Sequence, residues 1–262
     1  MQEIKRNVQI SIPFAMLQHP HLDRFLAEGL NPEIALEAAV FERFGRDDFV
    51  RIAHEFHQRS LRITLHGPFT DLAAGSADKD VRAITRRRLK QMLDLVPVFQ
   101  PYSVVCHAGY DWRRYGYNPS EWYRRSLKLW KWLAKKLLKS GSRLMLENVY
   151  ERGPEEILPL LEPLAEFGVG FCLDAGHQAS FGQSALEDWC RTLAPFLGQL
   201  HLHDNFGTGD DHLGLGQGVI DFGRLLELVK HASRVQPLIT LEIHDENEIL
   251  PGLAYLKRIW PW

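Results

Sequence analysis

Two periodicities of apolar and polar residues divide the chain. Eight short apolar runs are typical of buried β-strands, and six longer segments carry apolar residues at three- and four-residue spacing, as amphipathic helices do. The predicted strands are 8–12, 32–36, 61–66, 102–107, 143–148, 169–174, 199–204 and 238–243. The predicted helices are 46–59, 78–97, 119–140, 154–167, 184–197 and 222–234. Strands and helices therefore alternate, which predicts a parallel α/β fold.

Polar residues close six of the predicted strands. Each of these strands runs apolar and then ends in an imidazole or a carboxylate, at His66, His107, Glu147, Asp174, His201 and Glu242. In a (β/α)8 barrel the carboxyl ends of all strands meet on one rim, where such side chains converge. We therefore predict a (β/α)8 TIM barrel, formed by residues 1–262 as a single domain. A doubly wound sheet is the alternative, because the region 13–45 is irregular and the strand at 32–36 has the weakest pattern.

The stretch QLHLHDNFGTGDDHLGLGQG, residues 199–218, concentrates groups that bind metal ions. Alternation along the strand places His201 and His203 on one face. Further candidate ligands follow on a glycine-rich loop, which can turn sharply, and in an Asp-Ala-Gly-His sequence: Asp210, His212, Asp174 and His177. Neutral imidazoles suit zinc, manganese or iron(II), and carboxylates also suit manganese and magnesium. We therefore expect a divalent metal cofactor, zinc or manganese, with one to three ions.

Charge and cysteine content narrow the class of protein. The chain has 262 residues, a formal net charge of −2 and a pI near 6.6, which provide no overall attraction to nucleic acid or anionic membranes. We interpret its three cysteines, Cys106, Cys172 and Cys190, as reduced structural thiols. No apolar run reaches the roughly 20 residues of a membrane span, and the first residues lack a signal-peptide pattern. We expect a cytoplasmic protein without membrane association.

Six segments carry a resemblance to a known superfamily: LHGPF (65–69), VVCHAG (104–109), LMLENVYE (144–151), FCLDAGHQ (171–178), HLHDN with DDHLGLGQGVIDF (201–222) and TLEIHD (240–245). In these segments the chain resembles the xylose isomerase-like barrels. That superfamily joins sugar isomerases and epimerases to the endonuclease IV class of abasic-site endonucleases. The resemblance covers nearly the whole chain, and its most specific part is the HLHDN block with the glycine-rich turn after it.

The resemblance implies a metal site common to both branches, made by Glu147, Asp174, His201 and Glu242. His203 is held in reserve for His201, because related tagatose and psicose epimerases suggest the second histidine of such a pair. Endonuclease IV-like members have further ligands, and the matching positions here are His66, His107, His177, Asp210 and His212. The chain departs from the nuclease pattern, since HLHDNFGTGDDH replaces an HLND-type block with an Asp-Arg-His pair, and HAG replaces HPG.

The leading hypothesis is a metal-dependent isomerase or epimerase that acts on a small-molecule sugar or sugar phosphate. Metal bound to adjacent carbonyl and hydroxyl oxygens acidifies the neighbouring C–H. The resemblance assigns the catalytic roles to Glu147 and Glu242, one removing the proton and the other returning it through an enediolate. His177 and Glu151 are the candidates for substrate binding, and a solvated ion pair with Arg152 is the alternative for Glu151.

Two other functions compete with this hypothesis. An endonuclease IV-like zinc phosphodiesterase acting on abasic DNA would use the additional ligands. The loop 110–118, in which Trp112 and Tyr115 alternate with arginines, would then stack bases and contact phosphate. Its two other possible roles are to clamp a sugar phosphate and to cover the barrel rim, and the covering role is favoured. The basic run 84–91 is predicted to be the solvated face of an outer helix. The other competitor is a non-catalytic, metal-stabilised, sugar-binding barrel.

Overall fold

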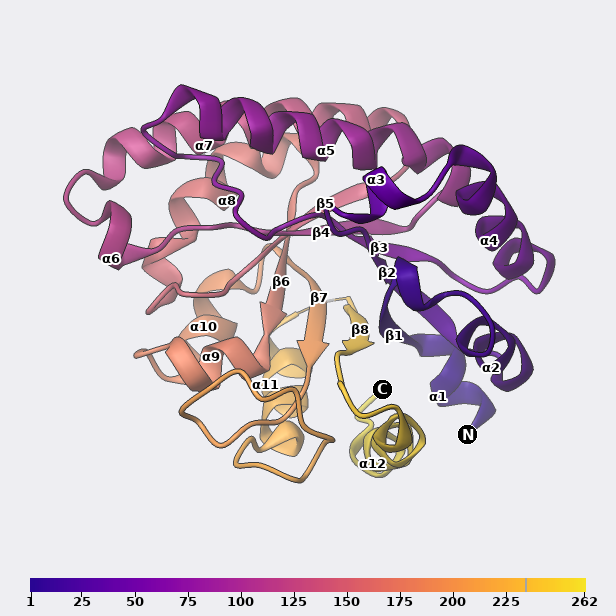
Figure 1. Cartoon of the computed structure of the whole chain (residues 1–262). Helices are drawn as coiled ribbons and strands as arrows, with labels where there is room; N and C mark the ends of the chain where they lie inside the picture. The colour runs from indigo at the N-terminus through magenta and orange to yellow at the C-terminus, as the bar shows by residue number, and fades with distance from the viewer. Residues whose placement is uncertain (234) are drawn as a thin grey trace.

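The computed structural model describes residues 1–233 and 235–262, which form a closed barrel of eight parallel strands (Figure 1). Each strand pairs with its neighbours in sequence, and β8 closes the barrel by pairing with β1. The strands are β1 (Val8–Pro13), β2 (Asn31–Ala35), β3 (Thr64–His66), β4 (Ser103–His107), β5 (Arg143–Glu147), β6 (Gly170–Asp174), β7 (Leu197–Leu202) and β8 (Leu238–Leu241). The predicted (β/α)8 barrel is confirmed, and the doubly wound alternative is wrong.

The strand register sets the polar strand ends beside one another. His107 pairs with Glu147 across β4 and β5, and Asp174 pairs with His201 across β6 and β7. All eight predicted strands are present, including the weakest one, which is β2. β3 begins at Thr64 rather than at residue 61, and β7 begins and ends two residues before the predicted 199–204.

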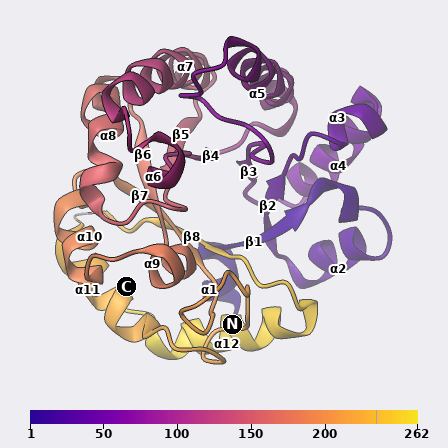
Figure 2. The same cartoon turned by 60° about the vertical axis from the view of Figure 1, so that its left-hand side comes forward.

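Helices form a ring around the strands (Figure 2). They are α1 (Gln2–Asn7), α2 (His21–Glu28), α3 (Val40–Arg43), α4 (Arg46–Gln58), α5 (Lys79–Phe99), α6 (Trp112–Tyr115), α7 (Pro119–Lys139), α8 (Leu158–Leu164), α9 (Ala175–Phe181), α10 (Leu186–Leu193), α11 (Phe222–Ala232) and α12 (Ile249–Ile259). Short 3-10 helices are η1 (Phe14–Met16), η2 (Pro154–Glu156), η3 (Ala165–Phe167) and η4 (Glu246–Glu248). No helix in the described part of the chain combines the length and apolar character that a membrane crossing requires.

The predicted helices are found with two corrections. α4, α5, α7 and α11 confirm four of them, although residue 234 of the predicted 222–234 lies outside the described residues. The predicted helix 154–167 is divided into η2, α8 and η3, because Pro159 and Pro163 lack the amide hydrogen of a continuous helix. The predicted helix 184–197 is reduced to α10, since Pro195, which has no amide hydrogen, cannot donate the hydrogen bond that would continue the helix.

Two apolar regions hold the barrel together. The larger lies between the strands and the helices, and the smaller lies inside the barrel and consists of Val105, Met145 and Cys172. His107 and Glu147 each follow a member of the inner cluster by two residues on the same strand, so they point to the same side. Beneath the polar rim, the barrel interior is thus apolar at β4, β5 and β6, whereas Thr64, Gln199 and Thr240 make it polar at β3, β7 and β8. The three cysteines are buried and free, as predicted.

Candidate metal centre

Four side chains at the strand ends form the central set, defined as Glu147, Asp174, His201 and Glu242. His201 Nδ1 lies 3.3 Å from Glu147 Oε1, 3.3 Å from Glu242 Oε1 and 4.0 Å from Asp174 Oδ2. The first three residues belong to β5, β6 and β7, and Glu242 follows β8. The closed sheet thus brings together ligands that are up to 95 residues apart in the sequence, from Glu147 to Glu242.

Glu147 also belongs to a histidine set, defined as His66, His107 and Glu147. Its Oε2 lies 3.1 Å from His66 Nε2 and 3.6 Å from His107 Nε2. His66 Nδ1 donates to the carbonyl oxygen of Gly67 at 2.9 Å, which turns Nε2 toward the carboxylate. One carboxylate therefore serves two neighbouring sets, with one oxygen in each.

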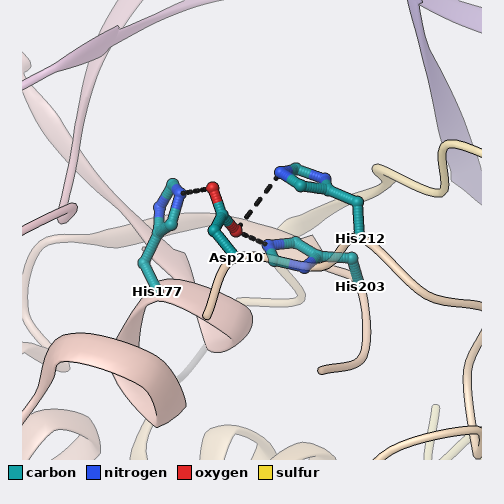
Figure 3. Close-up of side chains that lie close together, drawn as sticks. All are labelled: His177, His203, Asp210 and His212. Atoms are coloured by element: carbon teal, nitrogen blue, oxygen red, sulfur yellow. Dashed lines mark hydrogen bonds and ion pairs between the residues drawn. The ribbon is translucent and has the colours of Figure 1, made fainter. Parts of the chain in front are cut away.

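The third group is the loop set, defined as His177, His203, Asp210 and His212 (Figure 3). The Asp210 carboxylate lies between three imidazoles, with Oδ2 3.3 Å from His177 Nε2 and Oδ1 3.3 Å from His212 Nε2 and 3.6 Å from His203 Nε2. His203 Nε2 is also 3.2 Å from Asp174 Oδ1 of the central set. The loop set and the central set are thus contiguous.

All nine metal ligands predicted from the sequence lie in these three sets, and their role as ligands stays a prediction. The structure adds one residue, His203, to these nine candidate ligands. The sequence made it an alternative to His201, whereas the structure places His201 in the central set and His203 in the loop set.

Asp204 holds the loop that carries Asp210 and His212. Its buried carboxylate accepts hydrogen bonds from four backbone amides, those of Asn205, Gly216, Gly218 and Ile220, at 2.9 to 3.1 Å. Its backbone also pairs with that of Leu213. Because one buried side chain satisfies so many amides, the loop has a defined path despite its glycines.

Gly176 allows His203 to approach. A Cβ added at position 176 would lie 1.9 Å from Cε1 and 2.3 Å from Nε2 of the His203 ring. A glycine is therefore required between Asp174 and His177 for the loop set to take this geometry.

The three sets fit divalent cations. Several of their buried ligand atoms make no hydrogen bond within the described residues, namely Glu147 Oε1, Asp174 Oδ2, His201 Nδ1 and His203 Nε2. A buried polar atom left without a partner costs about 1–3 kcal/mol, so such a cluster is rare without a ligand. Ligands about 2.1 Å from a tetrahedral zinc ion are about 3.4 Å from one another. The 3.3 Å contacts of His201 match this spacing.

The carboxylates of the sets are ionised, whereas the imidazoles differ in their protonation. Burial opposes ionisation of Glu147, but the charges of His201 and His107 outweigh it and hold the Glu147 pKa well below its usual range. The pKa of Glu242 is lowered for the same reason, chiefly by His201. Desolvation lowers the pKa of His107 to about 4, so this imidazole is neutral at pH 7. Burial lowers the pKa of His177, His201 and His212, but the neighbouring carboxylates outweigh it and raise all three pKa values, that of His212 to about 9. Metal binds ionised carboxylates and neutral imidazoles, so an ion would displace the protons of these three histidines.

Glu33 is a contributor that the sequence reading missed. It is buried on β2, and its Oε1 lies 2.8 Å from His201 Nε2. Its Oε2 accepts from Gln199 at 2.6 Å, Thr64 at 2.7 Å and Thr240 at 3.1 Å. A carboxylate fixed in this way orients the imidazole and turns Nδ1 toward the central set. The sequence feature that could have identified Glu33 is its position within an otherwise apolar strand, because a carboxylate buried there needs partners.

Glu151 has a different place from the one expected. It is buried, does not line the central cavity, and accepts from the amides of Val149 at 2.7 Å and Tyr110 at 3.1 Å. The alternative ion pair with Arg152 is wrong, because Arg152 pairs with Glu156 at 2.5 Å. Glu151 therefore fastens the segments after β4 and β5 to each other. Burial raises its pKa to about 7, although the two amides oppose the shift.

The loop 110–118 forms α6 and lies beside the rim. Arg113 pairs with Asp111 at 2.9 Å and covers the Tyr150 ring at 4.8 Å, and the Arg152 guanidinium covers the Trp112 ring at 4.6 Å. These side chains contact one another and do not line the central cavity. The arrangement agrees with the covering role.

A cavity of about 590 Å³ opens over the three sets. Six of the candidate ligands line it: His66, His107, His177, Asp210, His212 and Glu242. Phe69 stacks on His107 with ring centroids 4.5 Å apart at the edge of this space. The volume is that of a site for a whole small molecule.

A family profile described as Xylose isomerase-like TIM barrel matches residues 32–259. The chain belongs to this family. The resemblance found in the sequence is therefore confirmed over most of the barrel.

The proteins and solved structures that the chain matches carry names of different kinds. The probable endonuclease 4 of Mycobacterium leprae is 27% identical over 213 residues, which are 76% of this chain and 79% of that protein. The structure of the TTHB071 protein from Thermus thermophilus, soaked with zinc chloride, is 29% identical with a TM-score of 0.83, over 97% of this chain and 98% of that one. A D-tagatose 3-epimerase-like protein is 19% identical with a TM-score of 0.83, over 97% and 96%. This last likeness concerns the fold.

We predict that Gly176→Ala weakens zinc binding at the loop set of this xylose isomerase-like barrel by roughly ten-fold or more, because the new Cβ displaces the His203 ring. Zinc titration against a chromophoric chelator measures the effect. Gly45→Ala is the matched control, since its Cβ would approach only Asp48 at 3.8 Å. Unchanged zinc binding in Gly176→Ala would contradict the geometry.

We predict that Glu33→Gln lowers zinc affinity at the central set roughly 10–100-fold, because His201 loses its orienting carboxylate. The same chelator competition measures this loss, and the thermal unfolding midpoint of the zinc-free protein reports whether the barrel persists. Glu42→Gln, at an exposed glutamate paired with Arg88, is the control. Equal affinities of wild type and Glu33→Gln would remove Glu33 from the site.

We predict that Glu151→Gln changes how stability depends on pH. The Glu151 pKa is raised from 4.5 to about 7, so the folded protein retains a proton that the unfolded chain releases between these values. The wild type therefore loses stability as pH rises through this window, by about 1–3 kcal/mol, and the variant does not. Urea unfolding with chelator at pH 4.5, 6 and 7.5 gives the difference between the two proteins. A difference that stays constant with pH would refute the shift.

Proposed function

We propose that this barrel is a metal-dependent hydrolase that acts on a small-molecule phosphoester. The observation that supports the proposal is that side chains from all three candidate metal sets line one cavity. Two or three divalent ions held by these sets would bind phosphate oxygens and lower the pKa of the attacking water. A reaction that needs a single ion would leave the histidine set and the loop set without a purpose.

The residues of the chain have separate tasks in this proposal. Glu147 joins the central set to the histidine set through its two oxygens. Glu33 orients His201 through its contact with Nε2, and Asp204 holds the loop that carries Asp210 and His212. The Phe69 ring covers His107 and keeps bulk water from that side of the set. The ligand atoms are thus held in place before a substrate arrives, so little reorganisation is needed during the reaction.

The placement of Glu147 favours hydrolysis over epimerisation. A base that removes a proton from a sugar carbon must touch the substrate, and Glu147 is buried and does not line the cavity. The sequence relative with an endonuclease 4 name is 27% identical, whereas the epimerase-like structure, at 19%, shares the fold.

The charges around the cavity favour a small molecule over duplex DNA. Besides six histidines, the ionisable residues that line it are one arginine and four carboxylates: Arg24, Glu37, Asp210, Glu242 and Glu246. A protein that binds nucleic acid neutralises several phosphates with lysine and arginine. The basic run 84–91 is on the outer helix α5, and the arginines of α6 lie outside the cavity.

A second candidate function is the epimerase of the leading sequence hypothesis. The observation in its favour is the pair of carboxylates, Glu147 and Glu242, each 3.3 Å from His201 Nδ1. In this case one ion in the central set would suffice, Glu242 would exchange the proton, and His177 would contact a sugar hydroxyl.

We predict that the protein purified without chelator contains two or three zinc ions per chain and cleaves bis(4-nitrophenyl) phosphate. Glu147→Gln should lower kcat at least roughly 100-fold, because two sets lose their shared ligand. Glu55→Gln, at a surface glutamate paired with Arg59, is the control. Mass spectrometry of metals and release of 4-nitrophenolate provide the measurements.

The other functions give different results in the same experiment. One ion per chain, no ester cleavage and solvent deuterium exchange into a ketose would identify the epimerase. Faster cleavage of an abasic oligonucleotide than of any small ester would identify the nuclease. Ligand binding without turnover of either substrate class would leave the non-catalytic barrel.

A further inference from the structure

The barrel rim is polar on one side and apolar on the other. β3 to β7 and the residue after β8 supply the candidate ligands, whereas β1 ends in Ile12 and Pro13 and β2 ends in Ala35. The cavity extends from the metal sets to this second side, so both sides belong to one space. Any ligand that fills the cavity meets two different surfaces.

The apolar side, here called the apolar wall, is built from three parts of the chain. Ile12 and Met16 come from β1 and η1, Phe25 and Leu30 from α2 and the segment after it, and Ile243 and Ile249 from the segment after β8 and from α12. Met16 is 43% exposed, while the other five are buried from solvent but border the cavity. A contiguous apolar wall in a pocket is typical of a site that binds apolar ligand groups.

The charged groups near the apolar wall are satisfied by one another. Arg24 lies 3.1 Å from Glu246, and His21 lies 3.5 Å from the same carboxylate. The guanidinium of Arg24 is therefore already paired and is not free to bind a second phosphate group of a ligand. The polar residues Ser11 and Glu37 also line this side, where they can form hydrogen bonds with a single hydroxyl or amine group of a ligand. A bare sugar would place most of its hydroxyls against apolar atoms, where an unpaired hydroxyl is costly.

We propose that the substrate is a phosphoester with a large, mainly apolar group, whose phosphate meets the metal sets and whose apolar part contacts the apolar wall. This inference rests on the proposed hydrolase function and specifies its substrate class. The metal sets recognise the phosphate that all phosphoesters share, and the apolar wall selects among them by the surface that it removes from water.

Calorimetric titration of the zinc-loaded protein with methyl phosphate and with 1-naphthyl phosphate tests the inference. We expect the naphthyl ester to bind at least roughly ten-fold more tightly to wild type, because its ring is buried against the apolar wall. Met16→Gln and Ile249→Gln should each lower this preference at least roughly three-fold. Leu138→Gln, at an exposed leucine of α7 far from the cavity, should leave both affinities unchanged.

The outcomes separate this inference from the proposed function. Equal affinity of the two esters for wild type, or a preference that survives both wall variants, overturns the apolar substrate class. Met16 is half exposed, so a folding defect in Ile249→Gln leaves one informative variant. A naphthyl preference without cleavage of methyl or naphthyl 4-nitrophenyl diesters refutes the hydrolase and retains the apolar ligand. Cleavage of both diesters at equal efficiency supports the hydrolase and refutes the apolar substrate class.

Discussion

The ionised carboxylate of Glu147, buried at the centre of the barrel, is the group on which the rest of the site depends. Removing such a charge from water costs several kcal/mol unless other groups compensate it. Here four imidazoles lie within 3.6 Å of its oxygens: those of His66, His107, His177 and His201. They come from β3, β4, α9 and β7, and only closure of the sheet brings them around one side chain. The site and the closed barrel therefore require each other.

The candidate ligands differ in how rigidly the fold holds them. Those of the central set stand on strands or directly after one, and His201 is further fixed by Glu33. In the loop set, Asp210 and His212 depend on a glycine-rich loop whose path is determined by the carboxylate of Asp204, and His203 depends on the missing side chain of Gly176. Strand pairing keeps backbone positions more firmly than loop contacts do. The central set is thus the permanent part of the site, and the loop set is the part that a substrate or a change in conditions alters first.

The pattern of apolar and polar residues predicted the strands and their polar ends, which depend on short stretches of sequence. Apolar runs that end in His66, Glu147 or Asp174 were sufficient to locate the strands and their shared rim, because strand ends in a closed barrel must converge. Proline positions were visible but were overruled by periodicity, so the helix at 154–167 appeared continuous. The role of Glu33 was not predictable, since its contact with His201 joins residues 168 positions apart. The hydrogen bonds of Glu151 to the amides of Val149 and Tyr110 were not predictable either, because a pattern places a residue after a strand and does not say which way its side chain turns.

The rim is divided into a side with the candidate ligands and an apolar side, and this division bears on the choice of substrate. Metal ligands recognise charge and oxygen atoms, which sugars, sugar phosphates and phosphodiesters all present, so they discriminate poorly among these substrates. Discrimination must then come from the side of the cavity without ligands, formed here by β1, η1, α2 and the start of α12. Apolar contacts contribute about 25 cal/mol per Å² of buried surface, so some tens of Å² change affinity by a factor of ten. β1 and β2 supply none of the candidate ligands, and only Glu33 of β2 contacts one of them, so apart from Glu33 this side can diverge without disturbing the metal sets. We therefore expect the choice of substrate in this barrel to depend on the residues of the apolar wall, which take no part in catalysis.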